Sequence, residues 1–355
     1  MADSPPSGKG YPISNPQTRV SPMDWRIEQI TPHDSSIGAL IDPWLNVCPS
    51  ATIFHTVEWN IIVQEVFQTT CKYFLAHEGG RLVGVFPCHM LKQGPWLTVC
   101  YSPPRQYEVS YGGPVAVGSQ AAKICAELVR AAGRMQVGVV VQIFNSPKNT
   151  AWVNKSEWKK VTTFETAYVD LSQPLEAIWS LSLDGKRRNM IRKAERNGVC
   201  IKNVAIEGLD EFYPIVQKMC KRSGLSLKPK LYYRRILEAF EPQGKAKLFL
   251  GYMNDKPVVG GIFLRHQDVA YYWIGATDTE IGNFGAGELL QWHVIQWAKQ
   301  SGCAWYDLVG IERERLPHIA IFKLGFTRHI EEFRHVNYAS LLTRIIRRAQ
   351  HLLCR

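Results

Sequence analysis

The stretch from Ala270 to Phe326 decides the fold of this chain. It contains AYYWIGATD (270–278), IGNFGAG (281–287), ELLQWHVIQWAKQSG (288–302), AWYDLVG (304–310) and IFKLGF (321–326). These pieces predict an aromatic strand, a glycine-rich turn, an amphipathic helix, a second strand and a short helix. Strand, helix and strand in this order form a right-handed crossover, which places the free N–H groups of a helix N-terminus beside a strand end. Such a place binds anions or a developing oxyanion.

The predicted helix has the spacing of a helix that packs on a sheet. Its apolar residues recur every three to four positions, at Leu290, Val294, Trp297 and Ala298. This periodicity is typical of a buried helix face. We therefore interpret that face as core rather than as a cofactor site.

Four groups of residues in this stretch resemble the C-terminal half of the GNAT acyltransferase fold. The resemblance is to the Fem-type branch, which comprises the peptidoglycan-bridge aminoacyl transferases and their FemAB-like relatives. It rests on the order and spacing of Tyr271-Tyr272-Trp273 with Gly275 and Ala276, the helix end at 298–302, Tyr306-Asp307-Leu308, and 322–326 (FKLGF). A motif counts for more when its predicted structural context is also present.

The N-terminal half carries a second resemblance of the same kind. Residues 25–30 predict a strand, Thr56 is a helix N-cap candidate, and Gly79-Gly80 joins two strands in a hairpin. The Fem-type signature here is His55-Thr56-x-Glu58-Trp59, Gly84-x-Phe86-Pro87 and Tyr111-Gly112-Gly113. The resemblance implies an α/β (α+β) chain of two tandem GNAT-like domains, each a mixed, mostly antiparallel twisted sheet flanked by helices. No internal sequence repeat is visible.

Length, composition and the resemblance together predict a chain of four parts. A chain of 355 residues exceeds what one hydrophobic core usually supports. We expect a disordered tail at 1–24, an N-terminal GNAT-like domain at 25–180, a C-terminal GNAT-like domain with the acyl-transfer site at 181–340, and a basic amphipathic helix at 341–355. The tail is rich in Pro, Ser and Gly and lacks the apolar core of a signal peptide.

Charge and cysteine usage narrow the class of protein. The net charge of +11 favours anionic partners, although many basic proteins use such charge only for solubility. Nine scattered cysteines without a C-x-x-C pair predict reduced, mostly buried thiols in a cytoplasmic protein and no metal site. No apolar run reaches the length of a membrane span.

The glycine-rich turn at 282–287 corresponds to the turn that cradles the pyrophosphate of acetyl-CoA in GNAT enzymes. Gly285 and Gly287 are the two later glycines of that motif, and we predict that they bind the phosphate of the donor. Gly282 replaces the leading Gln or Arg, and Ile321 stands where a general-acid tyrosine is often found. Both departures weaken an acetyl-CoA interpretation and suit the Fem-type branch better.

Three residues are the predicted catalytic group. By the resemblance, Lys323 supplies positive charge over the oxyanion or the donor phosphate, and Phe322 packs beside it; the alternative is a surface lysine. Asp307 lies in an otherwise apolar strand, and a buried Asp needs a partner or a function. It accepts the amine proton or orients Lys323, or else forms an ion pair with Arg265 or His293.

A basic helix and four aromatic residues complete the predicted site. In a helix over 183–196, Arg188 and Arg192 lie on one face with Arg196, which suits a run of phosphates or a solvated surface equally well. We predict that the substrate cleft is lined by Tyr272, Trp273, Tyr111 and Trp59.

Two classes of function follow. The first is an N-acyltransferase that moves an acyl or aminoacyl group from acyl-CoA or aminoacyl-tRNA to an amine of a cell-envelope or polysaccharide precursor, with no tightly bound cofactor. The second is a non-catalytic binding module that keeps the duplicated fold. The apolar and arginine residues of 341–355 predict either a peripheral contact with the anionic inner membrane surface, where a lipid-linked acceptor would lie, or a helix packed on its own domain.

Overall fold

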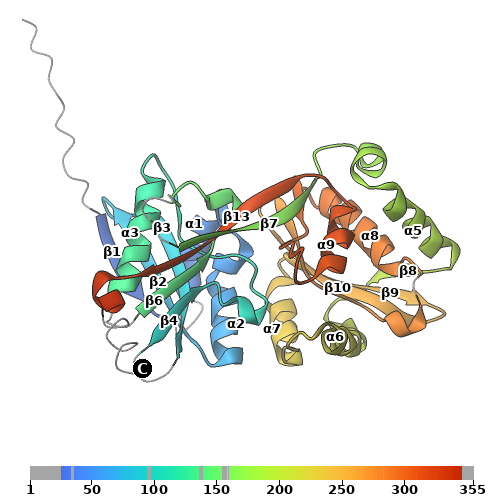
Figure 1. Ribbon diagram of the computed structural model, residues 1–355, viewed down its shortest axis with the longest axis horizontal. Coiled ribbons are helices and arrows are strands. Elements are labelled where there is room, and N and C mark those ends of the chain that lie inside the picture. Colours follow the sequence, from blue (N-terminus) through green and yellow to red (C-terminus); the bar gives the residue numbers. More distant parts are fainter. Residues whose placement is uncertain are drawn as a thin grey trace, which may run out of the picture.

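The computed structural model describes residues 25–32, 36–93, 97–135, 139–153, 158, 160–282 and 284–345. The expected N-terminal tail therefore lies outside the described residues, as do Asn283 and 346–355 of the expected C-terminal helix. Within the described part, thirteen strands form one continuous sheet whose order is β1-β2-β3-β4-β6-β13-β7-β12-β11-β10-β9-β8, with β5 on β3. Two bodies of helices and strands lie side by side along this sheet (Figure 1).

The elements of the N-terminal half follow the predicted order. Its helices and strands are β1 (Trp25–Ile30), α1 (Ser36–Val47), α2 (Val57–Phe67), β2 (Thr70–Glu78), β3 (Arg81–Lys92), β4 (Thr98–Ser102), β5 (Val115–Ala116), α3 (Ala121–Arg134), β6 (Val139–Phe144) and β7 (Lys160–Asp170). The predicted N-cap of α2 is confirmed, because the Thr56 side chain accepts a hydrogen bond from Trp59 N.

The C-terminal half repeats this order. Its elements are α4 (Leu175–Ala177), α5 (Gly185–Arg196), β8 (Cys200–Asn203), α6 (Leu209–Ser223), α7 (Lys230–Phe240), β9 (Ala246–Met253), β10 (Lys256–His266), β11 (Val269–Thr277), α8 (Ala286–Gln300), β12 (Trp305–Asp307), α9 (Pro317–Leu324) and β13 (Ile330–Ala339). Each half has one parallel strand pair joined through a helix, β4 with β6 through α3 and β11 with β12 through α8. The predicted crossover and the duplicated GNAT-like arrangement are thus present.

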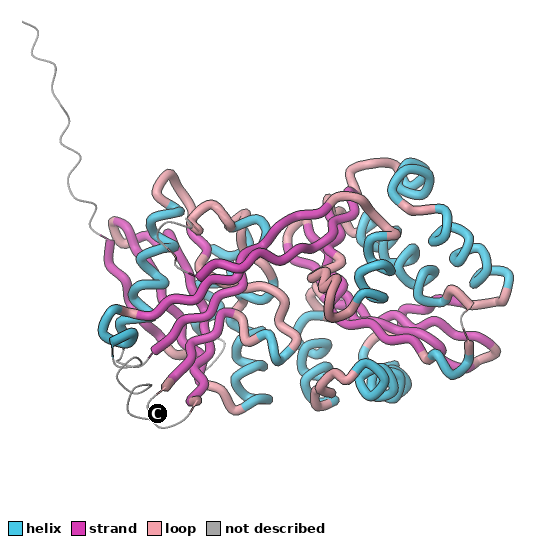
Figure 2. Tube along the Cα trace, in the orientation of Figure 1, coloured by secondary structure: helices cyan, strands magenta, loops and turns pink. Residues whose placement is uncertain are grey.

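The last strand of each half pairs with the other half. β7 follows β6 in the chain but pairs with β12, whereas β13 follows β12 but pairs with β6. β7 and β13 pair antiparallel with each other from Ile330↔Ala167 to Asn337↔Lys160. They run as two long ribbons across the junction of the two bodies (Figures 1 and 2). The two halves thus exchange their last strands. The domain boundary near residue 180 stays a prediction.

Helices cover both faces of the sheet and share their cores between the halves. One buried cluster joins α2 of the N-terminal half to α6 and α7 of the C-terminal half, and a second lies between α5, α8 and the other face. Eight cysteines are described, all as free thiols, and seven of them are buried. No described helix has both the length and the apolar character needed to cross a bilayer.

The exchanged strand β13 makes a testable contribution to stability. Phe333 is 1% exposed, and its ring packs 5.6 Å from Phe164 of β7 and 5.3 Å from Tyr111, centroid to centroid. We expect Phe333→Ala to lower the free energy of unfolding by about 3–5 kcal/mol, because it opens a cavity where the halves join. Urea unfolding measures the loss. Glu332→Ala, at the exposed neighbouring position, is the matched control and should change it by less than about 0.5 kcal/mol.

Candidate active site

Helix α5 docks onto the start of α8 and the end of α9. The Asp184 carboxylate caps α5 by accepting a hydrogen bond from Arg187 N at 2.6 Å, and Asp184 N donates to Gly325 O at 2.9 Å. Ile191 and Ala194 supply the buried face of α5. The predicted basic helix therefore exists, and its apolar side is part of the core.

A buried ion pair joins α5 to α8. Arg187 Nη1 donates to Glu288 Oε1 at 2.6 Å, and the two side chains are 5% and 11% exposed. The Arg187 guanidinium also lies 5.2 Å from the centre of the Phe322 ring and donates to Ile321 O. Glu288 is the third residue of α8, where a carboxylate is stabilised by the partial positive charge of the helix N-terminus.

The glycine-rich turn contacts α5 directly. Gly285 has φ +81°, and a Cβ at this position would lie 2.1 Å from Met190 O of α5. Only glycine tolerates both this backbone conformation and this close approach. Gly287 lies against Thr277 and the Phe322 ring. The predicted phosphate-binding role of the two glycines stays a prediction, and in this structure their neighbours are protein groups.

The two predicted phosphate-binding arginines also contact the protein. Arg188 Nη1 donates to the carbonyl oxygens of Trp179, Ser180 and Leu183, which belong to the turn before α5. Arg192 is exposed, with its guanidinium 5.4 Å from the centre of the Trp179 ring. Arg188 is thus held on backbone carbonyls, while Arg192 keeps a solvent-facing charge.

Asp307 and Lys323 are connected through one residue. Asp307 is fully buried, and its Oδ1 accepts from Thr166 Oγ1 at 2.6 Å and from Val309 N at 2.7 Å. Lys323 Nζ donates to Val309 O at 2.7 Å and to Gly310 O at 2.9 Å. The structure therefore brings the predicted carboxylate and cation together. The alternative partners of Asp307 are otherwise engaged: Arg265 donates to Ser301 O, and the His293 ring packs on Phe249.

Burial moves the pKa values of both groups toward the neutral forms. Burial raises the pKa of Asp307, and the hydrogen bonds from Thr166 and Val309 oppose this. Burial lowers the pKa of Lys323 to about 8, against the attraction of Asp307. A lysine with a pKa near neutrality can give and take a proton during turnover.

Val309 holds this connection in a strained backbone. Its φ of +47° lies in the left-handed region, which is a true outlier for a β-branched residue. Such strain costs about 1–3 kcal/mol and persists only where surrounding contacts enforce it. Here its N–H is bound to Asp307 and its carbonyl to Lys323, so the two side chains fix the conformation.

The predicted cleft residues lie on two faces of the sheet. Tyr272 stacks on Phe263 and its ring lies 5.8 Å from Lys323 Nζ, on the α8 side. Trp273 points the opposite way and packs 5.2 Å from Trp59, which is fully buried. Successive strand residues face opposite sides of a sheet, so Tyr272 and Trp273 are separated.

Tyr111 lies on the Asp307 side of the sheet. Burial and then the Asp307 charge raise its pKa. Within the described chain, neither its hydroxyl nor Asp307 Oδ2 has a hydrogen-bond partner.

The sequence analysis missed three residues of this arrangement. Arg187 and Glu288 are 101 positions apart, and only the acidic residue in the first turn of the helix hinted at their pairing. The sequence did not indicate that Thr166 contacts Asp307, because Thr166 belongs to the exchanged strand β7, 141 positions away. Among the described residues, no group of three or more His, Cys, Asp and Glu side chains could hold a metal ion.

Part of this arrangement lies in a region that matches a known protein family. Residues 185–315, which contain α5, α8 and Asp307, match the family model described as acetyltransferase (GNAT) domain. The chain is 32% identical over 166 residues to the UDP-N-acetylmuramoylpentapeptide-lysine N(6)-alanyltransferase of Weissella viridescens, covering 45% of this chain and 48% of that protein. Residues 185–315 are thus a GNAT domain by this match, and the chain is similar to transferases of the FemAB type.

Other relatives extend the comparison. The FemAB-like chain is 31% identical over 78 residues to the Lipid II:glycine glycyltransferase of Staphylococcus saprophyticus, over 22% of this chain and 19% of that protein. It therefore spans about half of the first curated relative and less of the second. Its fold matches the crystal structure of FemX with a TM-score of 0.69 at 14% identity, over 91% of this chain and 99% of FemX.

The buried ion pair of the FemAB-like chain can be tested by removing one or both charges. We expect Glu288→Ala to destabilise the protein by about 3–5 kcal/mol, because Arg187 is left charged and buried. The double variant Arg187→Met with Glu288→Leu should recover most of this loss, since no uncompensated charge remains. Urea unfolding measures both. Equal losses in the single and double variants would contradict a pairing role.

Proposed function

We propose that this FemAB-like protein is an aminoacyl transferase. It moves an aminoacyl group from aminoacyl-tRNA onto an amine of a cell-wall precursor. The observation that carries the proposal is the joined Asp307–Val309–Lys323 unit, of which Asp307 and Val309 lie within the residues that match the GNAT domain. The names of the two relatives, an alanyltransferase and a glycyltransferase, support the class of reaction.

Lys323 and Asp307 divide the charge stabilisation and the proton transfers of this reaction between them. The acceptor amine attacks the ester carbonyl, a C–N bond forms, and the C–O bond to the tRNA ribose breaks. Lys323, a cation below pH 8, stabilises the oxyanion and gives its proton to the departing ribose oxygen. Asp307 and the Val309 peptide hold that cation in place, and Asp307 takes the proton that the amine loses. Phe322 packs beside Lys323, between Arg187 and Phe326.

The closed start of α8 favours aminoacyl-tRNA over acyl-CoA as donor. A pyrophosphate at this helix would meet the Glu288 carboxylate and the Met190 carbonyl, both of which already occupy its positive end. Opening the buried ion pair would cost about 3–5 kcal/mol. The net charge of +11 suits a polyanionic donor, and exposed Arg192 is the predicted phosphate contact that faces solvent.

We further propose that the protein works in the cytoplasm at the inner membrane surface. The described start of the C-terminal helix exposes Leu341, Leu342 and Ile345 beside Arg344. Apolar side chains next to arginine suit an anionic membrane. This placement would bring the site to a lipid-linked acceptor, of the kind that the name of the staphylococcal relative states for that protein.

A transfer assay tests the proposed reaction. The protein is incubated with tRNA that carries labelled alanine and with a muramoyl pentapeptide linked to UDP or to a lipid. The pentapeptide contains a diamino acid whose side-chain amine is free. We expect transfer by the unaltered protein and a loss of about 100-fold or more in Lys323→Met, because the oxyanion loses its charged donor. Lys256→Met, at an exposed hairpin position, is the control and should keep full activity.

Donor binding separates the alternatives in a second measurement. Titration calorimetry with acetyl-CoA should give no binding heat, whereas charged tRNA should be retained on filters with a steep dependence on salt. Tight binding of acetyl-CoA would overturn the choice of donor. If no donor supports transfer, the alternative is favoured, in which the protein is a non-catalytic binding module with the duplicated fold.

The pKa of Lys323 predicts an alkaline limit to activity. Its proton is lost as the pH rises through about 8, so kcat should fall by about tenfold per pH unit above that value. Lys323→Arg stays charged and should lose this limb, even if its rate is lower. A pH–rate profile of both proteins measures the effect. An alkaline limb that persists unchanged in Lys323→Arg would assign it to another group.

A further inference from the structure

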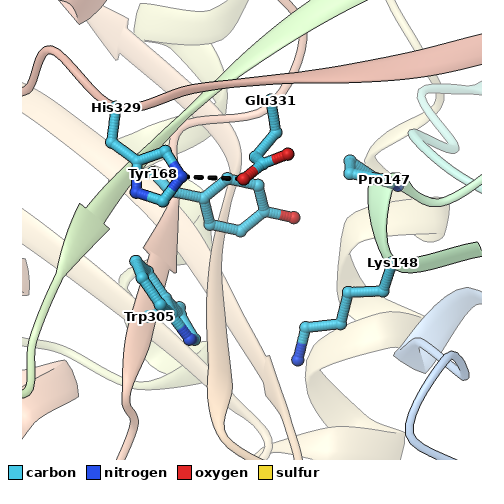
Figure 3. A pocket seen from close by; sticks show the side chains of 6 residues that line it. All are labelled: Pro147, Lys148, Tyr168, Trp305, His329 and Glu331. Atoms are coloured by element: carbon cyan, nitrogen blue, oxygen red, sulfur yellow. Dashed lines mark hydrogen bonds and ion pairs between the residues drawn. The ribbon is translucent and has the colours of Figure 1, made fainter.

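A cavity of about 240 Å³ lies where β7, β12 and β13 meet the turn after β6. It is on the sheet face that carries Asp307, because Trp305 is two residues before Asp307 on β12 and Tyr168 is directly opposite Asp307 on β7. Figure 3 shows its six lining residues, which are Pro147, Lys148, Tyr168, Trp305, His329 and Glu331.

Three aromatic rings form the walls of this cavity. The Trp305 and His329 rings are 5.2 Å apart at 84°, and the Tyr168 and Trp305 rings are 6.0 Å apart at 85°, centroid to centroid. In each pair the edge of one ring meets the face of the other, so the three rings bound the cavity without stacking into one layer. The face of an aromatic ring attracts a cation, and several faces around one space form a cage for an ammonium group.

The charged residues of the cavity strengthen this preference. Glu331 lies at the rim, accepts a hydrogen bond from His329 Nε2 at 2.8 Å and is about half exposed. On the opposite wall, Lys148 is paired with Asp268 at 3.0 Å, so its charge is largely balanced by a group outside the cavity. A ligand cation would therefore meet the Glu331 carboxylate and the Tyr168 and Trp305 rings, which line the cavity with His329 (Figure 3).

We propose that this cavity binds the primary ammonium group of an amino-acid residue. The bound group is not the amine that reacts, because a carboxylate and ring faces stabilise the charged form, and only the neutral amine attacks a carbonyl. The cavity recognises a second amino group carried by one of the two substrates, next to the transfer centre. This role rests on the proposed aminoacyl transfer.

Two sources can supply such a group. The aminoacyl ester of the donor carries a free α-ammonium beside the carbonyl that is attacked. The acceptor peptide can carry an ammonium on another residue. Both ligands present the same chemistry to Trp305 and Glu331, but they differ in the distance from the ammonium to the acyl carbonyl.

Direct binding measurements on the full chain test the inference without any transfer reaction. L-Alaninamide stands for the aminoacyl group of the donor and N-α-acetyl-L-lysine for an acceptor residue. Propionamide and N-acetyl-norleucine are the matched analogues without the ammonium. We expect saturable binding, followed by ligand-detected NMR, for at least one ammonium-bearing probe and for neither neutral analogue. The probe that binds identifies the source.

Two variants connect the binding to this cavity. Glu331→Gln keeps the shape of the side chain and removes its charge, and it should lower the affinity for the probe about tenfold. Trp305→Leu removes one ring wall and should weaken it similarly. Glu332→Gln, one residue along β13 and exposed, is the control that should bind as the unaltered protein does. Circular dichroism verifies the fold of each variant.

The outcomes separate this inference from the proposed function. No saturable binding, equal binding of the neutral analogues, or unchanged affinity in Glu331→Gln would each overturn the ammonium site. Probe binding that persists in Lys323→Met, where transfer is expected to be lost, shows that the cavity recognises its ligand independently of catalysis. A protein that binds the probe but transfers nothing keeps this site and loses only the proposed reaction.

Discussion

The antiparallel pairing of β7 with β13 is the interaction on which the rest of the structure depends. Each of these strands follows one half of the chain and pairs with the other half, so neither half has a complete sheet alone. The exchange also builds the site. Thr166 and Tyr168 belong to β7 by sequence, yet they lie against Asp307 and Trp305 of the C-terminal half. The duplicated fold is therefore one cooperative unit at its centre.

Buried charge is tolerated in this unit because each charged group has specific partners. Asp307 accepts hydrogen bonds from a side chain and a backbone N–H, and Lys323 donates to two carbonyls. Removing such groups from water costs several kcal/mol per ion, which only good geometry offsets. The strained Val309 supplies that geometry, since one residue serves both partners. The proposed catalytic pair is thus held at a fixed separation before any substrate binds.

Local sequence patterns predicted much of the fold and the central pair of the site. The strand at 25–30 and the Thr56 N-cap agree with their local patterns, and Asp307 is buried as its apolar strand indicated. The remaining features depend on contacts between distant segments. Neither the position of β13 beside β6 nor the Arg187–Glu288 pair has a local signal. The sequence alone could have predicted that Tyr272 and Trp273 lie on opposite faces, because successive side chains alternate along a strand.

At the start of α8, protein groups lie close to the glycine-rich turn. Gly285 keeps the left-handed conformation of a phosphate-binding turn, but the close approach it permits is used by Met190 of α5. Glu288 places a carboxylate in the first helical turn, where the helix dipole would otherwise attract a phosphate, and Arg187 neutralises it. Packing alone therefore requires glycine at position 285, and the role of the turn in phosphate binding stays a prediction. A motif defined by glycines reports backbone geometry, and only the groups that face it decide whether a ligand or another helix occupies the site.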